Sequence, residues 1–170
     1  MGDSKTKIHL GCGEKYLEGY VNIDFPADEH TIMKPKADIL TDIRQLEYPE
    51  NSIDEIRSHH LFEHFSRTDA IDLLLKWRRW LKPDGVLRIE TPDFYRCCRW
   101  FIFSNFEERM QLMRHIFGSQ EARWAYHLDG WGKQKFKFFL KKLGFYRIKF
   151  KKSPEVLKIF VSYILEDWSF

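Results

Sequence analysis

The residues whose types and spacing could do chemistry follow two short apolar runs near the start of the chain. Leu10–Gly13 (LGCG) comes directly after one run, and Asp24 ends the next. Glycine lets the backbone turn sharply and lets a ligand approach with no Cβ in the way. A carboxylate at the neighbouring strand end can accept two hydrogen bonds from a ribose diol. Taken singly, the glycines could form a plain tight turn, and Asp24 could cap a turn before Pro26.

A second carboxylate, Asp42, follows a third apolar run, Ala37–Leu40. It could accept a hydrogen bond from an adenine amino group, or it could cap the turn that follows. By chance, a Gly-x-Gly loop and two acids rarely occur together at three successive strand ends, whereas any one of these features alone is common. The pattern favours a nucleotide-like ligand at the carboxyl ends of parallel strands.

Histidines and an acid gather after a fourth apolar run: His59, His60, Glu63 and His64. Histidine titrates near neutral pH and can serve as a general base. His60 is one candidate catalytic base, with the alternative that it only lines a ligand pocket. His64 and Glu63 could instead hold the start of the following helix.

His127 is the second candidate base, and it lies in the loop segment Tyr126–Trp131. Asp129 could orient it, or His127 could make a purely structural hydrogen bond. The aromatic stretch Phe94–Trp100 could wall a substrate pocket, although such residues are more often part of a core.

The elements that must position these residues alternate between strands and helices. Ser66 with Asp69 forms a capping-box pattern at the start of the clearest helix, and Gly144 closes the last one. A short link through Ser153 and Pro154 predicts that the last two strands are antiparallel. Strands are expected over 7–10, 20–23, 37–40, 53–58, 86–90, 146–150 and 158–165, and helices over 66–81, 106–117 and 134–143. This alternation predicts an α/β fold whose mostly parallel sheet is covered on both faces.

Jointly, these segments resemble the class I S-adenosylmethionine-dependent methyltransferases, and most closely their small, type 11-like branch. The resemblance covers Lys7–Phe94 well and Phe117–Phe150 loosely. Its motifs are Lys7–Gly13, Gly19–Asp24, Ala37–Asp42, Asn51–Ile56, Leu61–His64, Trp80–Ile89, Thr91–Asp93 and Leu143–Phe145.

The resemblance implies a three-layer Rossmann-like sandwich. Its seven-stranded sheet would have the order 3-2-1-4-5-7-6, with an antiparallel edge formed by the sixth and seventh strands. The cofactor would be S-adenosyl-L-methionine, with Asp24 on the ribose hydroxyls and His60 beside the sulfonium. The implied cofactor contacts are Leu10, Gly11, Cys12, Gly13, Asp24, Asp42, Ile43, Ser58 and His59.

The chain departs from the family pattern at the first loop. His9 stands where most relatives carry an acid, and Lys15 stands where a third glycine is usual. Only ten residues separate Gly13 from Asp24, which is too short for a full crossover helix. We therefore expect a single turn or an irregular loop around Glu14–Glu18.

A length of 170 residues favours a single domain over residues 1–170, and 44% hydrophobic and 16% aromatic residues are ample for its packed core. No apolar signal segment opens the chain, and its longest strongly apolar stretch, Val156–Leu165, is short and contains Lys158, so a cytoplasmic protein without a membrane span is expected. None of the three cysteines forms a Cys-x-x-Cys pair, so a zinc site is not expected, and no residue is assigned to a metal.

The expected function is methyl transfer to a small-molecule or saccharide acceptor, such as O-methylation in surface-polysaccharide biosynthesis, by analogy with short relatives. Nine Lys or Arg residues and no acid lie between Lys133 and Lys152. They could track a nucleic-acid backbone, which leaves an RNA methyltransferase as an alternative, or they could be a solvated face. A cofactor-binding module without turnover is the third alternative. No motif specifies the acceptor or the oligomeric state.

Overall fold

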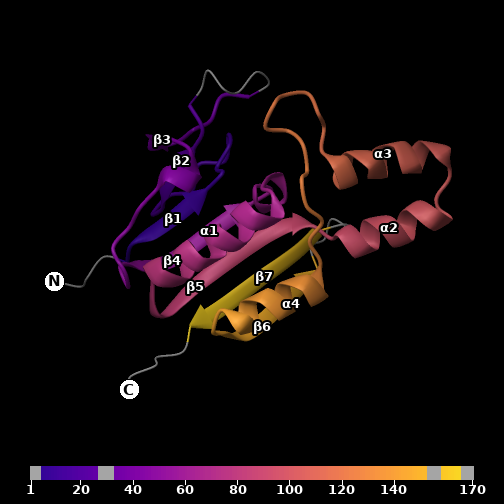
Figure 1. Cartoon of the computed structure of the whole chain (residues 1–170). Helices are drawn as coiled ribbons and strands as arrows, with labels where there is room; N and C mark the ends of the chain where they lie inside the picture. The colour runs from indigo at the N-terminus through magenta and orange to yellow at the C-terminus, as the bar shows by residue number, and fades with distance from the viewer. Residues whose placement is uncertain (1–4, 27–32, 153–157, 166–170) are drawn as a thin grey trace.

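The structure is a computed structural model that describes residues 5–26, 33–152 and 158–165. Its central feature is a sheet whose strands follow the order β3-β2-β1-β4-β5-β7-β6 (Figure 1). The strands are β1 Lys7–Leu10, β2 Val21–Asp24, β3 Ile39–Leu40, β4 Ile53–His59, β5 Leu81–Pro92, β6 Phe145–Lys152 and β7 Lys158–Leu165. The first five pair in parallel, whereas β7 is antiparallel to both β5 and β6. The predicted α/β fold with a mostly parallel sheet is confirmed. The antiparallel strand itself lies one place in from the edge strand β6.

The helices are α1 Arg67–Trp80, α2 Phe94–Phe103, α3 Phe106–Phe117 and α4 Lys133–Lys142, with short 3-10 turns η2 Ile43–Gln45 and η3 Phe62–His64. The predicted start of α1 is confirmed, because the Ser66 side chain accepts a hydrogen bond from the Asp69 backbone N–H. Gly144 adopts a φ of 80°, as expected for a residue that ends a helix. The loop between β1 and β2 contains turns and no helix, also as predicted.

The core of the molecule lies on one face of the sheet, which we call the apolar face (Ile8, Leu10, Ile56, Leu87 and Ile89). All five residues are fully buried and belong to one cluster with side chains of α1 and α4. Figure 1 shows these two helices side by side over the sheet. Because α1 and α4 share a single core, they cover the same face.

The opposite side, which we call the polar face, carries His9, Glu55, Arg57, His59 and Arg88. Register partners point the same way, and His9 pairs with Arg57, which pairs with Arg88. Among the described residues no helix packs on this face. The expected three-layer sandwich is therefore wrong for the part of the chain that the structure describes. The physical reason is that the short connection between β1 and β2 contains no helix to form the second layer.

Two further elements differ from expectation. Phe94–Phe103 forms α2, which packs against α3 and extends beyond the sheet (Figure 1) rather than joining the core. Phe103 is 84% exposed, and only Cys97 of this helix is buried. Strand β5 begins at Leu81, five residues earlier than predicted, because Leu81 pairs with Ile53 ahead of a register shift in the ladder. The predicted Ser153–Pro154 link lies outside the described residues. None of the described helices has the length and apolarity needed to cross a membrane.

Candidate functional site

The loop after β1 is tied to the end of β2. Gly11 and Gly13 adopt φ values of 65° and 54°, which favour glycine. The Gly11 N–H donates to the Ile23 carbonyl over 2.9 Å, and the Gly13 N–H donates to Asp24 Oδ2 over 2.5 Å. A second backbone donor, the N–H of Phe25, reaches Asp24 Oδ1 over 2.8 Å. These bonds hold the Asp24 carboxylate beside the glycine loop.

A cavity of about 450 Å³ opens at this loop. This volume lies within the range typical of small-ligand sites. Three residues predicted to contact a cofactor, Gly11, Gly13 and Asp24, line it together with the candidate base His60. The remaining wall comes from Phe25, Met33, Arg44, Leu61, His64, Phe65, Asp69, Arg123, Trp124 and Leu128. The cavity thus lies at the carboxyl ends of β1, β2 and β4, where ligands of open α/β sheets bind.

The neighbours of the glycine pair are buried. Leu10 belongs to the core, and Cys12 is 4% exposed with its thiol directed at the Lys36 carbonyl over 3.5 Å. Burial, and next the charge of Asp24, raise the pKa of the Cys12 thiol to about 12. Cys12 is therefore a packed thiol and not a nucleophile. Its backbone remains part of the loop that faces the cavity.

Asp42 caps η2 and does not itself line the cavity. Its two carboxylate oxygens hold the guanidinium of Arg44 over distances of 2.6–3.0 Å, and Arg44 is the residue that reaches the cavity wall. Burial raises the pKa of Asp42, but the hydrogen bonds and charge of Arg44 outweigh it and lower the pKa below its ordinary value. Ile43 is buried in the core.

Ser58 and His59 lie on opposite faces of β4, outside the cavity wall. Ser58 is fully buried on the apolar side. His59 lies on the polar face, where its Nε2 accepts a 2.7 Å hydrogen bond from Arg57 and its ring meets that of His9 edge-on. Burial, and then the positive charge of Arg57, lower the pKa of His59 to about 3.

The two candidate bases differ in position. His60 lines the cavity, with Nδ1 3.4 Å from Glu63 Oε1 and Nε2 3.3 Å from Glu90 Oε1. His127 lies behind the wall, and its ring packs edge-on against that of His64 at 4.8 Å between centroids. Burial lowers the pKa of His127, although the nearby charge of Glu63 opposes the shift.

Asp129 does not orient His127, which corrects the hypothesis drawn from the sequence. The Asp129 carboxylate forms ion pairs with Lys135 and Arg67, while His127 Nδ1 donates to the backbone carbonyl of His115 over 3.0 Å. Two residues along an irregular loop have no set spatial relation, so their spacing carried no information about contact.

Glu63 is the buried acid of the site, and its side chain is 3% exposed. Burial raises its pKa, but contact with His60 and the charges of His64 and His127 outweigh burial and lower the pKa below its ordinary value. The Glu63 carbonyl accepts the Leu128 N–H over 2.9 Å, which fastens the distant loop to η3.

Several cavity residues escaped sequence reasoning. His64 was interpreted as holding the start of a helix, yet it lines the cavity. Arg44 stands next to the predicted Ile43, and its charge beside an acid was the signal that could have indicated it. Met33, Arg123 and Trp124 come from irregular segments with no periodicity to read.

Comparison with known proteins agrees with this geometry. Residues 8–89 match a family model described as a methyltransferase domain, of type 11. The chain is similar to a SAM-dependent methyltransferase from Archaeoglobus fulgidus, with TM-score 0.63 and 15% identity over 95% of this chain and 86% of that one. A second, from Methanosarcina mazei, has TM-score 0.64 and 13% identity over 98% of this chain and 94% of that one.

A third similar structure, described as a possible exported protein from Bordetella parapertussis, has TM-score 0.60 and 15% identity. The match covers 95% of this chain but only 62% of that longer chain. No curated protein matches the sequence.

The fold and the cavity define an α/β protein with a ligand site at the carboxyl ends of its parallel strands. The match over residues 8–89 and the methyltransferase folds of the similar structures confirm the resemblance of this chain to the class I S-adenosylmethionine-dependent methyltransferases of the type 11-like branch. S-adenosyl-L-methionine is the cofactor that this resemblance supports.

Proposed function

We propose that the cavity binds S-adenosyl-L-methionine and that the chain transfers its methyl group to a small-molecule or saccharide acceptor. The observation that carries the proposal is that Gly11, Gly13 and Asp24 line one cavity. A Cβ on Gly13 would reach to 3.3 Å from Met33 Sδ and occupy space at the cavity wall. The glycine loop therefore leaves room for a ligand to lie against the backbone.

Asp24 fits the role of ribose ligand. Backbone N–H groups of Gly13 and Phe25 hold one carboxylate oxygen each, so the group is oriented before any ligand arrives. A carboxylate oxygen has lone pairs left after one such bond, and two ribose hydroxyls can donate to them. This arrangement supports the assignment of Asp24 from the sequence.

For the adenine, we propose that Asp42 acts through Arg44. The carboxylate fixes the planar guanidinium at the cavity wall, where it can stack on a flat base. Ile43 would support this segment from the core. We assign contact with the amino-acid end of the cofactor to the backbone of Leu10–Gly13. Ser58 and His59 would support this contact indirectly, by holding the end of β4 within the sheet.

The bound cofactor would supply a methyl group activated on a sulfonium. The chain's own contribution is to align the acceptor and to keep water out, because displacement at carbon needs alignment of the reacting atoms. His60 lines the cavity and lies between two carboxylates, so it can take a proton from an acceptor hydroxyl. His127 lies behind the wall against the ring of His64, so it would influence the acceptor indirectly.

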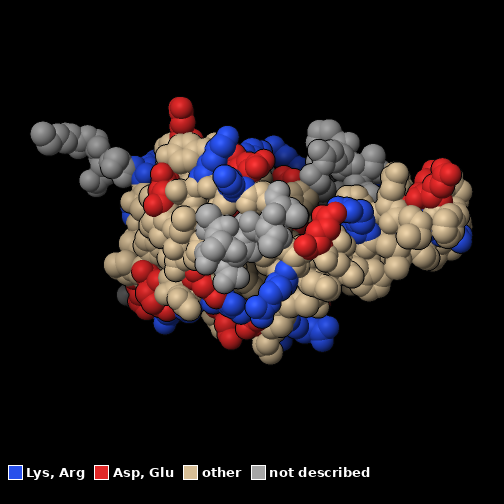
Figure 2. Space-filling model, turned by 90° about the horizontal axis from the view of Figure 1, so that it is seen from above, with Lys and Arg blue, Asp and Glu red and all other residues tan. Residues whose placement is uncertain are grey.

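The far side of the cavity supports a polar acceptor with flat apolar faces. Phe65 and Trp124 offer aromatic surface, and Asp69 and Arg123 offer groups for hydrogen bonds to hydroxyls. A saccharide combines both properties. Charge on the face shown in Figure 2 argues less for nucleic acid, because Lys and Arg are mixed with Asp and Glu there and form no continuous basic surface.

Calorimetric titration with the demethylated product, S-adenosylhomocysteine, tests cofactor binding. Wild-type protein should bind one equivalent. Asp24→Asn should weaken binding by about 10–100-fold, the loss of one hydrogen bond to a charged group. Asp54→Asn is the matched control, because Asp54 lies at the amino end of β4, where it pairs with Lys82. If the folded wild-type protein binds no ligand, the proposal is wrong.

Transfer from methyl-labelled cofactor to isolated cell fractions tests the acceptor. Label in the polysaccharide or small-molecule fraction is expected. Label in RNA, together with binding that falls steeply with salt, would favour the nucleic-acid alternative. Cofactor binding with no label in any fraction would favour a binding module.

A further inference from the structure

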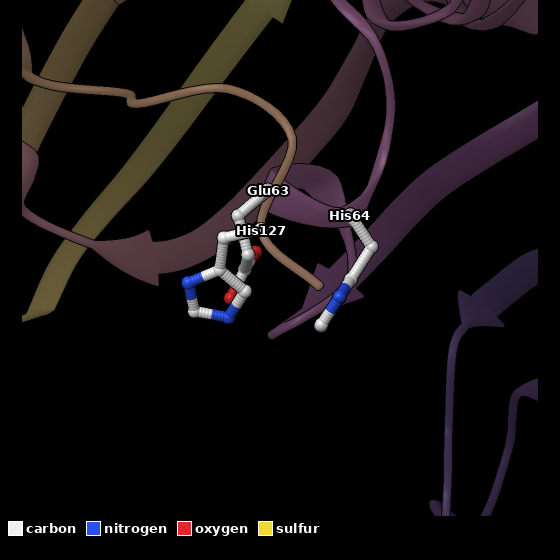
Figure 3. Close-up of side chains that lie close together, drawn as sticks. All are labelled: Glu63, His64 and His127. Atoms are coloured by element: carbon white, nitrogen blue, oxygen red, sulfur yellow. The ribbon is translucent and has the colours of Figure 1, made fainter. Parts of the chain in front are cut away.

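Two histidines and one buried glutamate converge beside the cavity. Glu63 and His64 come from η3, and His127 comes from the loop before α4. One ligand atom from each lies within 4.8 Å of the others. Figure 3 shows the three side chains reaching from these two segments into the same space. Backbone hydrogen bonds from Leu128 and Asp129 to the Glu63 carbonyl hold the two segments together.

The two imidazoles are oriented like those of metal ligands. His64 Nδ1 lies 2.9 Å from the Tyr126 carbonyl, and His127 Nδ1 lies 3.0 Å from the His115 carbonyl. A carbonyl oxygen only accepts, so each Nδ1 carries the proton and each Nε2 carries the lone pair. A histidine that binds a metal through one nitrogen commonly donates its other N–H in this way.

Glu63 supplies an independent observation. Its side chain is 3% exposed, and no donor among the described residues lies within normal hydrogen-bonding geometry of either carboxylate oxygen. The approach of His60 Nδ1 to Oε1, at 3.4 Å, is longer than a normal hydrogen bond. A buried carboxylate with so few donors is costly unless a cation or ligand compensates it.

We propose that Glu63, His64 and His127 bind one divalent transition-metal ion such as Zn²⁺ or Mn²⁺. Ligands of a tetrahedral zinc lie about 3.3 Å from one another, so shifts of about 1 Å in the side chains would close the site. Two imidazoles and one carboxylate suit zinc and the first-row transition metals, whereas magnesium and calcium prefer oxygen ligands alone.

The position of the site indicates its use, and this part rests on the proposed function. His64 also lines the cavity, so an ion held by three protein ligands would keep coordination positions open on that side. An acceptor hydroxyl bound there would lose its proton to solvent more readily, since a bound cation lowers the pKa of an oxygen ligand. The ion would thus select acceptors with a hydroxyl oxygen.

Titration of chelator-treated full-length protein tests the site. Calorimetry with Zn²⁺ and visible absorption with Co²⁺ should both give one equivalent, and Mg²⁺ should bind at least tenfold more weakly than Zn²⁺. His127→Gln should weaken Zn²⁺ binding at least tenfold, and Glu63→Gln should do the same. His115→Gln is the matched control, because it removes an imidazole but keeps the carbonyl that orients His127.

Two outcomes would overturn the proposal: no stoichiometric Zn²⁺ binding, or equal affinity in wild type and His127→Gln. Because Glu63→Gln changes a buried group, the loop variant His127→Gln decides the case if Glu63→Gln fails to fold. Titration with S-adenosylhomocysteine separates this proposal from the previous one. His127 does not line the cavity, so His127→Gln should still bind that ligand as wild type does.

Discussion

The two faces of the sheet are built differently. On the apolar face, Ile56 and Leu87 are fully buried beneath α1. On the polar face, their neighbours Arg57 and Arg88 remain partly exposed. Parallel sheets are commonly covered on both faces, and their strands then read as continuous apolar runs. Here β4 and β5 alternate, which shows that a parallel sheet can be one-sided when the connection between its first two strands contains no helix.

The largest effect is expected on the apolar face. Trp77→Ala should destabilise the protein by about 3–5 kcal/mol, because Trp77 is fully buried and packs against Phe62 at 5.6 Å between ring centroids. Urea denaturation followed by circular dichroism measures the change. Leu75→Ala is the control on the same helix, since Leu75 is 46% exposed and should cost far less. Equal losses would mean that α1 does not bury the face described.

The polar face should make stability depend on pH. The pKa of His59 falls from 6.5 to about 3 on folding, and burial also lowers that of His9. Between these values the unfolded chain binds a proton that the folded chain does not, so stability present above about pH 6.5 is lost as the pH falls. His59→Gln should reduce the drop in melting temperature between about pH 7 and pH 5. An unchanged drop would contradict this explanation.

The smallest effect is expected from the ion pair on the polar face. Arg88 Nε lies 2.7 Å from Glu55 Oε1, with the two side chains 35% and 13% exposed. A double-mutant cycle of Arg88→Gln and Glu55→Gln should give a coupling of about 0.2–1 kcal/mol, as for other pairs near a surface. The coupling should shrink in about 1 M salt. A coupling of several kcal/mol would mean that this face is buried in the protein as it exists in solution.

Local signals predicted much of the fold. The bounds of α3 matched those predicted, and the Ser66 cap of α1 was correctly read. Both depend on interactions within one or two turns. The aromatic stretch that became α2 was assigned to a core or a pocket wall, because composition does not say which face of a helix finds a partner.

The residues of the candidate site also fall into two groups, those that local sequence predicted and those that only the folded chain brings to the site. Gly11, Gly13 and Asp24 lie within fourteen consecutive residues, and a strand–loop–strand pattern was enough to bring them together. Arg44 was missed because its place at the cavity wall depends on how Asp42 at the start of η2 holds its guanidinium. Asp129 was misread because ion pairs with Lys135 and Arg67 hold it elsewhere.

By itself, the sequence determined the alternation of strands and helices, the glycine loop, the acid at the end of the second strand and the resemblance to the methyltransferases. These features need only local geometry and the rule that ligands bind where parallel strands end. Tertiary structure alone decided which face of the sheet the helices cover, and it brought His127 to Glu63 and His64 across more than sixty residues. Contacts between segments so far apart depend on packing of the whole chain, which no periodicity in the sequence encodes.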